Sequence, residues 1–147
     1  MLGPVASTGP LAFGDVDGDG TLELFIGGRL VAGRYPEPAT SLLLRNEGGR
    51  FVVAQRLEEL GLVSGAVFSD LDQDGLPELV LACEWGPLRL FKFADGRLVA
   101  WPVNVTGLAP NPAARVGLEH LRGWWNGVTT GDFDGDGRLD LWRRTGA

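Results

Sequence analysis

The sequence has 147 residues, of which 44% are hydrophobic, and it includes 23 glycines and 9 prolines. A chain of this length can bury one hydrophobic core, and the frequent glycine and proline favour the many turns of an all-β domain. The formal net charge is −6, but 12 of the 19 acidic residues lie in three short segments, so the charge indicates local sites and not a general affinity for cationic partners. The arginines are scattered, which argues against nucleic-acid binding.

A single cysteine, Cys83, excludes an intramolecular disulfide and argues against a metal–thiolate cluster. We expect a buried thiol, because free cysteine behaves as a small hydrophobic residue. Residues 1–4 contain neither a basic region nor a long apolar run, so we expect no visible signal peptide, and no segment is long enough to span a membrane.

The first acidic motif occupies residues 15–23 and reads Asp-Val-Asp-Gly-Asp-Gly-Thr-Leu-Glu. Carboxylates stand at positions 1, 3, 5 and 9, and glycine at position 6 permits a tight turn that would bring them to one point. Ca²⁺ takes roughly six to eight oxygen ligands, including carboxylates and backbone carbonyls. The spacing therefore predicts a calcium site. Residues 11–14 and 23–27 on either side predict buried strands, and residues 1–10 at most a short edge strand at 5–7.

A long connection and a hairpin are expected between the first and second motifs. Residues 28–39, with two glycines and two prolines, form the expected connection. Residues 41–45 and 50–54 are expected strands around Asn-Glu-Gly-Gly at 46–49, which tolerates the positive φ of a hairpin turn. The first repeat thus has four expected strands.

The acidic motif occurs twice more. Residues 70–78 read Asp-Leu-Asp-Gln-Asp-Gly-Leu-Pro-Glu, and residues 132–140 read Asp-Phe-Asp-Gly-Asp-Gly-Arg-Leu-Asp. Strands are expected around these motifs at residues 65–69, 78–83, 88–93, 97–103, 127–130 and 139–143. The strands of the second repeat are apolar on both faces, which predicts a sheet that is covered on both sides.

An EF-hand loop shares the first half of this motif, but it ends with a bidentate Glu at position 12 and lies between two helices. Position 12 is here Ile26, Leu81 or Arg143, and none of these can supply that ligand. The short apolar runs beside the motifs indicate strands instead of helices. The EF-hand is therefore excluded, and an acidic turn without metal is the alternative to a calcium loop.

Residues 13–28, 68–82 and 130–141 resemble the FG-GAP or VCBS repeat. This resemblance implies the blades of a β-propeller, with a calcium loop between the first and second strands of each blade. It predicts an all-β fold with two complete four-stranded blades and a partial third. The expected domain covers residues 1–147, with blade one at about 11–55, blade two at about 64–104, an insertion at about 105–124 and a partial blade three at about 125–147.

The predicted calcium ligands are the four carboxylates of each motif and the backbone carbonyl at position 7. They are Asp15, Asp17, Asp19, Thr21 and Glu23 in loop one, Asp70, Asp72, Asp74, Leu76 and Glu78 in loop two, and Asp132, Asp134, Asp136, Arg138 and Asp140 in loop three. Because no helix pair flanks these loops, we expect three structural Ca²⁺ ions and not a conformational switch.

The insertion is the least repetitive part of the chain, and such segments often carry function. Five of its side chains could stack on a sugar or line a partner site. They are Arg115, His120, Arg122, Trp124 and Trp125. The alternative is that the tryptophans pack in the core and that residues 116–121 form one short helical turn.

The resemblance implies a secreted, extracellular module for adhesion, for scaffold assembly, or for binding a protein or a glycan. The alternative is a polysaccharide lyase on a calcium-bearing propeller, with Tyr35 and several arginines as candidate groups. We expect no enzyme, because one His and one Cys cannot form the Ser/His/Asp or Cys/His sets of nucleophilic catalysis.

Two full blades and two further strands are too few to close a propeller, which typically has about four to eight blades. We therefore expect apolar faces and open strand edges that need partners. The partners would be the rest of a longer propeller, or other copies of the chain joined head to tail. In the second case residues 2–9 or another segment would complete the open blade of a neighbour.

Overall fold

The structure is a computed structural model that describes residues 6–105 and 116–145. The described chain is all-β apart from one 3₁₀ turn, η1 (Leu118–His120). The strands are β1 (Ala6–Gly14), β2 (Glu23–Val31), β3 (Ser41–Glu47), β4 (Arg50–Leu57), β5 (Leu62–Ser69), β6 (Glu78–Pro87), β7 (Arg89–Ala94), β8 (Arg97–Ala100), β9 (Asn104–Val105), β10 (Val116–Gly117), β11 (Arg122–Gly131) and β12 (Asp140–Thr145). Within residues 6–105 and 116–145, no helix is long and apolar enough to cross a bilayer.

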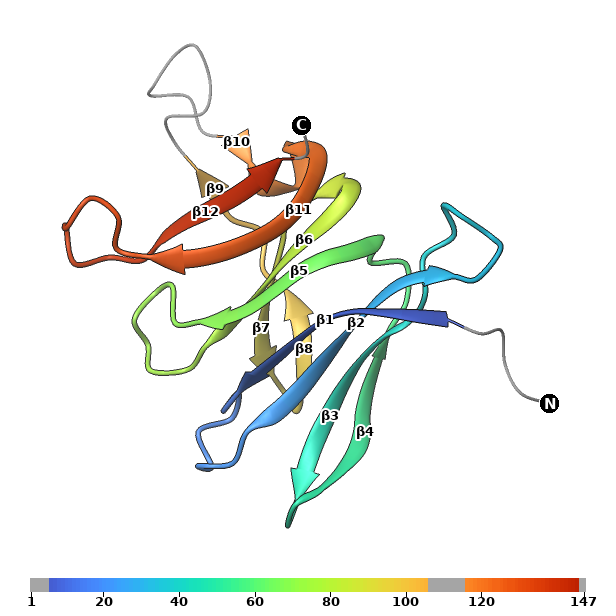
Figure 1. Cartoon of the computed structure of the whole chain (residues 1–147). Coiled ribbons are helices and arrows are strands. Elements are labelled where there is room, and N and C mark those ends of the chain that lie inside the picture. Colours follow the sequence, from blue (N-terminus) through green and yellow to red (C-terminus); the bar gives the residue numbers. More distant parts are fainter. Residues whose placement is uncertain (1–5, 106–115, 146–147) are drawn as a thin grey trace.

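The first sheet is antiparallel and has the order β1-β2-β3-β4 (Figure 1). β1 and β2 are both longer than the sequence predicted, because residues 6–8 pair with residues 28–31. This pairing corrects two expectations. The connection expected at 28–39 is shortened to residues 32–40, and the short edge strand expected at 5–7 extends over residues 6–14 as part of β1.

The second sheet has six antiparallel strands in the order β12-β11-β6-β7-β8, with β5 also paired to β6. β11 has two partners along its length. Its first residues, Arg122–Trp124, pair with the end of β6, and its remaining length pairs with β12. The strands of the third repeat are therefore hydrogen-bonded to those of the second, and β11 begins inside the segment that was expected to be an insertion.

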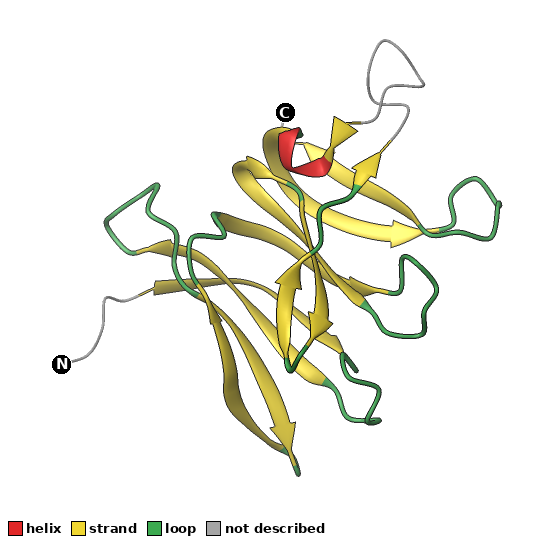
Figure 2. Cartoon of the chain, turned by 180° about the vertical axis from the view of Figure 1, so that it is seen from behind, coloured by secondary structure: helices red, strands yellow, loops and turns green. Residues whose placement is uncertain are grey.

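The first strands of the three repeats, β1, β5 and β11, lie side by side (Figure 1). A Cβ added at Gly65 of β5 would lie only 2.8 Å from the backbone nitrogen of Val128 in β11, so the close approach of these two strands requires glycine. The three acidic loops that follow these strands lie on one side of the molecule, and the connection 32–40 lies at the opposite ends of the strands (Figure 1 and Figure 2).

Both faces of β6 are buried, as the apolar pattern of the second repeat predicted. Its first six residues are all buried. Leu79 and Leu81 lie in a core that is shared with the first sheet, whereas Val80 and Ala82 lie in a second core with Trp125 of β11. β6 is therefore the strand around which the two cores are arranged.

Cys83 of β6 is a free and fully buried thiol, which confirms the prediction from the sequence. Its Sγ lies 3.2 Å from the carbonyl oxygen of Leu60. Burial raises the pKa of the thiol to about 11, so the thiol stays protonated at neutral pH. Cys83 is thus a core residue and not a reactive group.

The two tryptophans of β11 have different environments. Trp125 is only 5% exposed, and its Nε1 donates a hydrogen bond to the Gly86 carbonyl oxygen at 3.0 Å. Trp124 is 45% exposed. Successive residues of a strand point to opposite faces. Trp125 therefore packs in the core, as the alternative interpretation of the insertion expected, whereas Trp124 is at the surface. The 3₁₀ turn η1 confirms the short helical turn expected within residues 116–121.

Candidate metal loops and an opposing pocket

Each acidic loop joins two antiparallel strands of one sheet: β1 to β2, β5 to β6, and β11 to β12. In every case the residue before the first Asp pairs with the ninth residue of the loop. These pairs are Gly14–Glu23, Ser69–Glu78 and Gly131–Asp140. The strand pairing therefore brings the two ends of each loop together before any metal is considered.

The first Asp of each loop organises the turn by accepting backbone hydrogen bonds. The Asp15 carboxylate accepts the N–H groups of residues 18–20 at 2.8, 3.1 and 3.0 Å. Asp132 accepts the three equivalent bonds at 2.7, 3.1 and 3.0 Å. Asp70 accepts two, both at 3.0 Å. These contacts point the backbone of the turn toward the carboxylate at position 1.

Positions 4 and 6 of every loop have the left-handed backbone conformation. Position 6 is glycine in all three loops, with φ between 84° and 93°. Position 4 is glycine in loops one and three, but in loop two it is Gln73, whose φ of 62° is uncommon for a residue with a side chain. The Gln73 Nε2 donates to the Gly137 carbonyl oxygen of loop three at 2.8 Å, so the two loops are in contact.

The carboxylates of each loop gather into a cluster. In every cluster one oxygen from each of three residues lies within 4.8 Å of the others. The clusters are Asp15 with Asp17 and Asp19, Asp70 with Asp72 and Glu78, and Asp132 with Asp134 and Asp136. Loop two thus differs from the others, because the ninth residue replaces the fifth in its cluster.

The seventh and ninth residues complete the loops. The carboxylate at position 9 accepts the backbone N–H of position 2 at 3.3, 2.8 and 2.9 Å in loops one to three. The backbone N–H of position 7 donates to the carboxylate at position 5 at 2.7, 2.9 and 2.8 Å. The residues at position 7 are Thr21, Leu76 and Arg138, and those at position 9 are Glu23, Glu78 and Asp140.

The environment of the Glu23 carboxylate tests whether these loops suit a cation. It is only 2% exposed, and its Oε1 has no hydrogen-bond partner among the described residues. Burial raises the pKa of Glu23, and the nearby charges of Asp17 and Asp19 raise it further, against the lowering effect of the backbone N–H groups of Val16 and Asn46. A buried, unpaired carboxylate oxygen beside two acids fits a hard cation such as Ca²⁺, which binds oxygen ligands.

Loop two also contains a cation from the protein itself, which sequence reasoning missed. The Lys92 ammonium of β7 forms ion pairs with Asp72, Asp74 and Glu78. Its hydrogen bond to Asp72, followed by those to Asp74 and Glu78, holds the pKa of Lys92 well above its usual range. Lys92 is separated from loop two by a strand and a turn, so spacing within the motif carries no signal of this contact.

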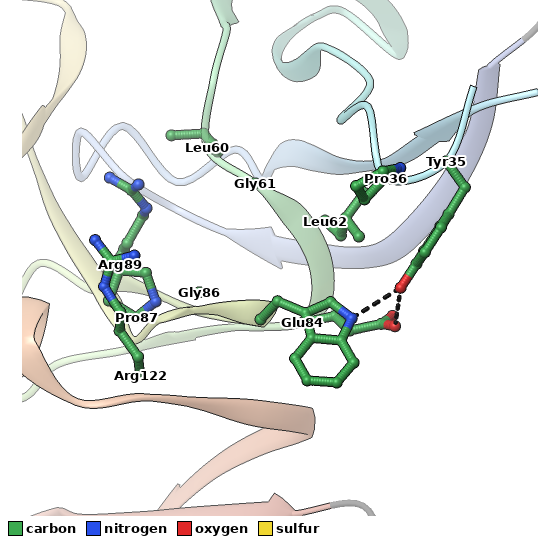
Figure 3. Close-up of a pocket in the computed structure, with 11 residues that line it drawn as sticks. Tyr35, Pro36, Leu60, Gly61, Leu62, Glu84, Gly86, Pro87, Arg89 and Arg122 are labelled. Atoms are coloured by element: carbon green, nitrogen blue, oxygen red, sulfur yellow. Dashed lines mark hydrogen bonds between the residues drawn. The ribbon is translucent and has the colours of Figure 1, made fainter.

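A pocket of about 570 Å³ lies at the ends of the strands opposite the acidic loops (Figure 3). Its lining comes from the connection 32–40, the connection between β4 and β5, the end of β6 and the starts of β5, β7 and β11. The pocket therefore lies where the two sheets meet, with Tyr35 on one side and Arg89 on the other (Figure 3).

Exposed aromatic rings form one part of this pocket region. Trp85 is 57% exposed and has a φ of 59°, a strained conformation for a tryptophan. Its Nε1 donates to the Tyr35 hydroxyl at 2.8 Å, and that hydroxyl donates to the Glu84 carboxylate at 3.1 Å (Figure 3). The Trp85 ring stacks on Trp124 with a centroid separation of 4.9 Å. Glu84 is held in turn by an ion pair with Arg29 of β2.

Arginine side chains form another part of the pocket. Arg89 and Arg122 both line it (Figure 3), and neither forms an ion pair with an acidic residue of the described chain. The Arg89 Nε is buried without a hydrogen-bond partner. An unpaired buried guanidinium nitrogen favours an anionic or polar ligand, because leaving a buried donor unpaired is costly.

The residues proposed from the insertion are only partly brought together. Arg122 lines the pocket, Trp124 stacks at its edge, Trp125 is in the core, and His120 is exposed on η1. Arg115 lies outside the described residues. Sequence reasoning missed Glu84 and Trp85, which continue β6 beyond its expected end at residue 83, and Arg89 at the start of β7. The only signal available was the run of polar and aromatic residues that follows Cys83.

We expect Asp15→Ala to destabilise the protein even in excess chelator, because three backbone N–H groups lose their acceptor. The free energy of unfolding should fall by about 1–3 kcal/mol. Asp17→Ala is the matched control, because Asp17 accepts only one such bond, at 3.3 Å. Urea denaturation in EDTA measures both variants, and equal effects would contradict an organising role for position 1.

Comparison with protein families gives a match that agrees with this geometry. Residues 70–142 match the FG-GAP-like repeat family, a segment that begins at the first Asp of loop two and ends after loop three. A search of curated proteins gave no match. Loop one lies outside the matched segment but has the same spacing and the same turn. Residues 70–142 are therefore an FG-GAP-like repeat segment, as the resemblance in the sequence predicted.

Proposed function

We propose that this protein is a non-catalytic, extracellular β-propeller module that is stabilised by calcium and binds a carbohydrate. The FG-GAP-like repeat segment and the all-β fold support an extracellular propeller-like module. The side-by-side arrangement of β1, β5 and β11 supports the reading of the three repeats as blades, with these strands innermost.

The buried and unpaired Oε1 of Glu23 carries the calcium proposal. With Asp15, Asp17 and Asp19 beside it, loop one concentrates negative charge that repels strongly unless a cation is present. The predicted ligands of loops one to three, including the position 7 carbonyls, would hold one Ca²⁺ each. Each loop joins two strands of one sheet, so binding should stabilise the fold and not switch it.

We expect calcium removal to lower the melting temperature. A site that is saturated at about 1,000 times its Kd contributes roughly 4 kcal/mol to stability, so EDTA should lower the Tm by about 5 °C or more. Differential scanning calorimetry with and without EDTA measures this shift, and Mg²⁺ in place of Ca²⁺ is the control. An unchanged melting curve, or a titration that shows no Ca²⁺ binding, would falsify the proposal.

The pocket at the opposite end of the strands supports carbohydrate binding. Exposed aromatic rings such as Trp85 and Trp124 offer flat apolar faces, and polar groups in the same pocket can bind hydroxyls. Arg89 and Arg122, which form no ion pair among the described residues, favour a sugar with a carboxylate. A uronate polysaccharide combines both features and is the ligand class that we propose.

We expect Trp85→Ala to weaken binding of polygalacturonate by about tenfold or more, because it removes both the stacked ring and the partner of Tyr35. Trp142→Ala is the matched control, since Trp142 is similarly exposed (56%) but does not line the pocket. Isothermal titration calorimetry measures the affinities. Equal affinities in the two variants would contradict the assignment, and the absorbance of an unsaturated product would support the alternative, a lyase.

The outer face of the first sheet supports assembly with further blades. Leu11 and Phe13 of β1 and Phe51 and Val53 of β4 are all exposed, although their strand neighbour Ala12 is buried. Phe13 and Phe51 are in contact, with ring centroids 6.2 Å apart. A contiguous apolar face of this kind usually marks an interface. We propose that other copies of the chain, or further blades of a longer propeller, cover it.

We expect light scattering to give a mass that is a multiple of 15.7 kDa, and we expect Phe13→Asp to reduce it to the monomer mass. A buried charge at an apolar interface is costly unless it is paired. Val99→Asp is the control, because Val99 is also an exposed apolar residue (40%) but lies on β8. A folded wild-type monomer would show that copies of this chain do not cover the face.

A further inference from the structure

Lys92 extends from β7 into the carboxylates of loop two. Its Nζ lies 3.0 Å from Oδ2 of Asp74 and 3.1 Å from Oε1 of Glu78, and it also forms an ion pair with Asp72. The Trp101 ring adds a cation–π contact, with its centroid 4.7 Å from Nζ. One ammonium group is therefore paired with three of the four carboxylates that are predicted to bind calcium in this loop.

The corresponding position in the first repeat provides a natural comparison. Continuing the register of β6 and β7 places Lys92 opposite Glu78, and the same step between β2 and β3 places Arg45 opposite Glu23. Arg45 forms no ion pair within the described chain. The two repeats thus have a basic residue at the same position of the third strand, but only Lys92 pairs with its loop.

The ion pair between Lys92 and Glu78 is stronger than an ordinary surface ion pair, because the Glu78 carboxylate is buried. Glu78 is only 2% exposed, and the Lys92 side chain is 28% exposed. Exposed ion pairs contribute little to stability, but removing one partner from a buried pair is strongly destabilising, because a buried charge is left without compensation. Because Lys92 is partly exposed, its ion pairs stabilise the protein by an amount between these two cases.

The same carboxylates cannot serve Lys92 and a calcium ion equally. Two cations held by one set of oxygens repel each other, so Ca²⁺ can bind with full coordination only if the ammonium moves away. Lys92 is attached to a strand and stays near the loop. In loop one no ion pair with Arg45 occupies the carboxylates, although the charge of Arg45 contributes to lowering the pKa of Asp19, and the Glu23 Oε1 is left without a hydrogen-bond partner.

We propose that Lys92 is an internal counter-ion of loop two, which keeps this loop closed without calcium and makes it the weakest of the three calcium sites. This inference rests on the calcium function proposed above. Loops one and three would then depend on calcium, whereas loop two would retain its shape when calcium is removed. The unequal loops would make the response to calcium gradual, with two sites filling before the third.

Lys92→Met tests the proposal, with Arg45→Met as the matched control at the equivalent position. In calorimetric titrations with CaCl₂ alone, the wild type and Arg45→Met should bind two ions tightly and a third about tenfold or more weakly. Lys92→Met should bind three ions with similar affinity. Adding Asp70→Asn to Lys92→Met should remove the tightened site and so identify it as loop two.

A second measurement does not require calcium. In EDTA, Lys92→Met should melt several degrees below both the wild type and Arg45→Met, because the loop-two carboxylates lose their counter-ion. Lys92→Gln, which loses the charge but keeps a polar group, replaces Lys92→Met if the latter does not fold. An unchanged third site together with an unchanged Tm in EDTA would overturn the proposal. If no variant binds Ca²⁺, the calcium function fails, and the Tm in EDTA still decides whether Lys92 is a counter-ion.

Discussion

The burial of β6 on both faces is the constraint on which the other features of this structure depend. Val80 and Leu81 are completely buried, on opposite faces of the strand, and burying a side chain of this size stabilises a fold by about 1.5–3 kcal/mol. The strand begins at Glu78, the ninth residue of loop two, and ends at Pro87, which lines the pocket. One buried strand therefore positions an acidic loop at one end and a pocket at the other.

The acidic loops could be predicted from the sequence because all their contacts are local. The carboxylate at position 1 accepts hydrogen bonds from backbone N–H groups three to five residues away. The glycine that adopts the left-handed conformation at position 6 can be read directly from the sequence. The extension of β2 could not be predicted in this way. Gly28 looked like the start of a connection, but its N–H donates to the Ser41 hydroxyl at 2.9 Å, and an added Cβ would lie 2.1 Å from the Ala39 carbonyl oxygen. Contacts with Ala39 and Ser41, and not the local sequence, therefore explain why residue 28 is glycine.

The residues that sequence reasoning missed have the same explanation. Lys92 reaches loop two only because β6 and β7 pair in one register, and a shift of one residue would turn its side chain to the other face. Trp85 became part of the pocket region because β6 continues past Cys83 and because Tyr35 and Trp124 come from other strands and loops. Fold class and local turns follow from short-range patterns, whereas the contacts that distinguish one loop from another follow from strand register.

The pocket and the packing of the two sheets depend on the same contacts. Arg29 belongs to β2 in the first sheet and Glu84 to β6 in the second, and their ion pair is partly buried at the junction. Glu84 also accepts the Tyr35 hydroxyl hydrogen bond, and Tyr35 orients Trp85. A change in the angle between the sheets would therefore move the aromatic rings of the pocket. Because the acidic loops lie at the opposite ends of the same strands, they can stabilise this angle through the sheets without touching a ligand in the pocket.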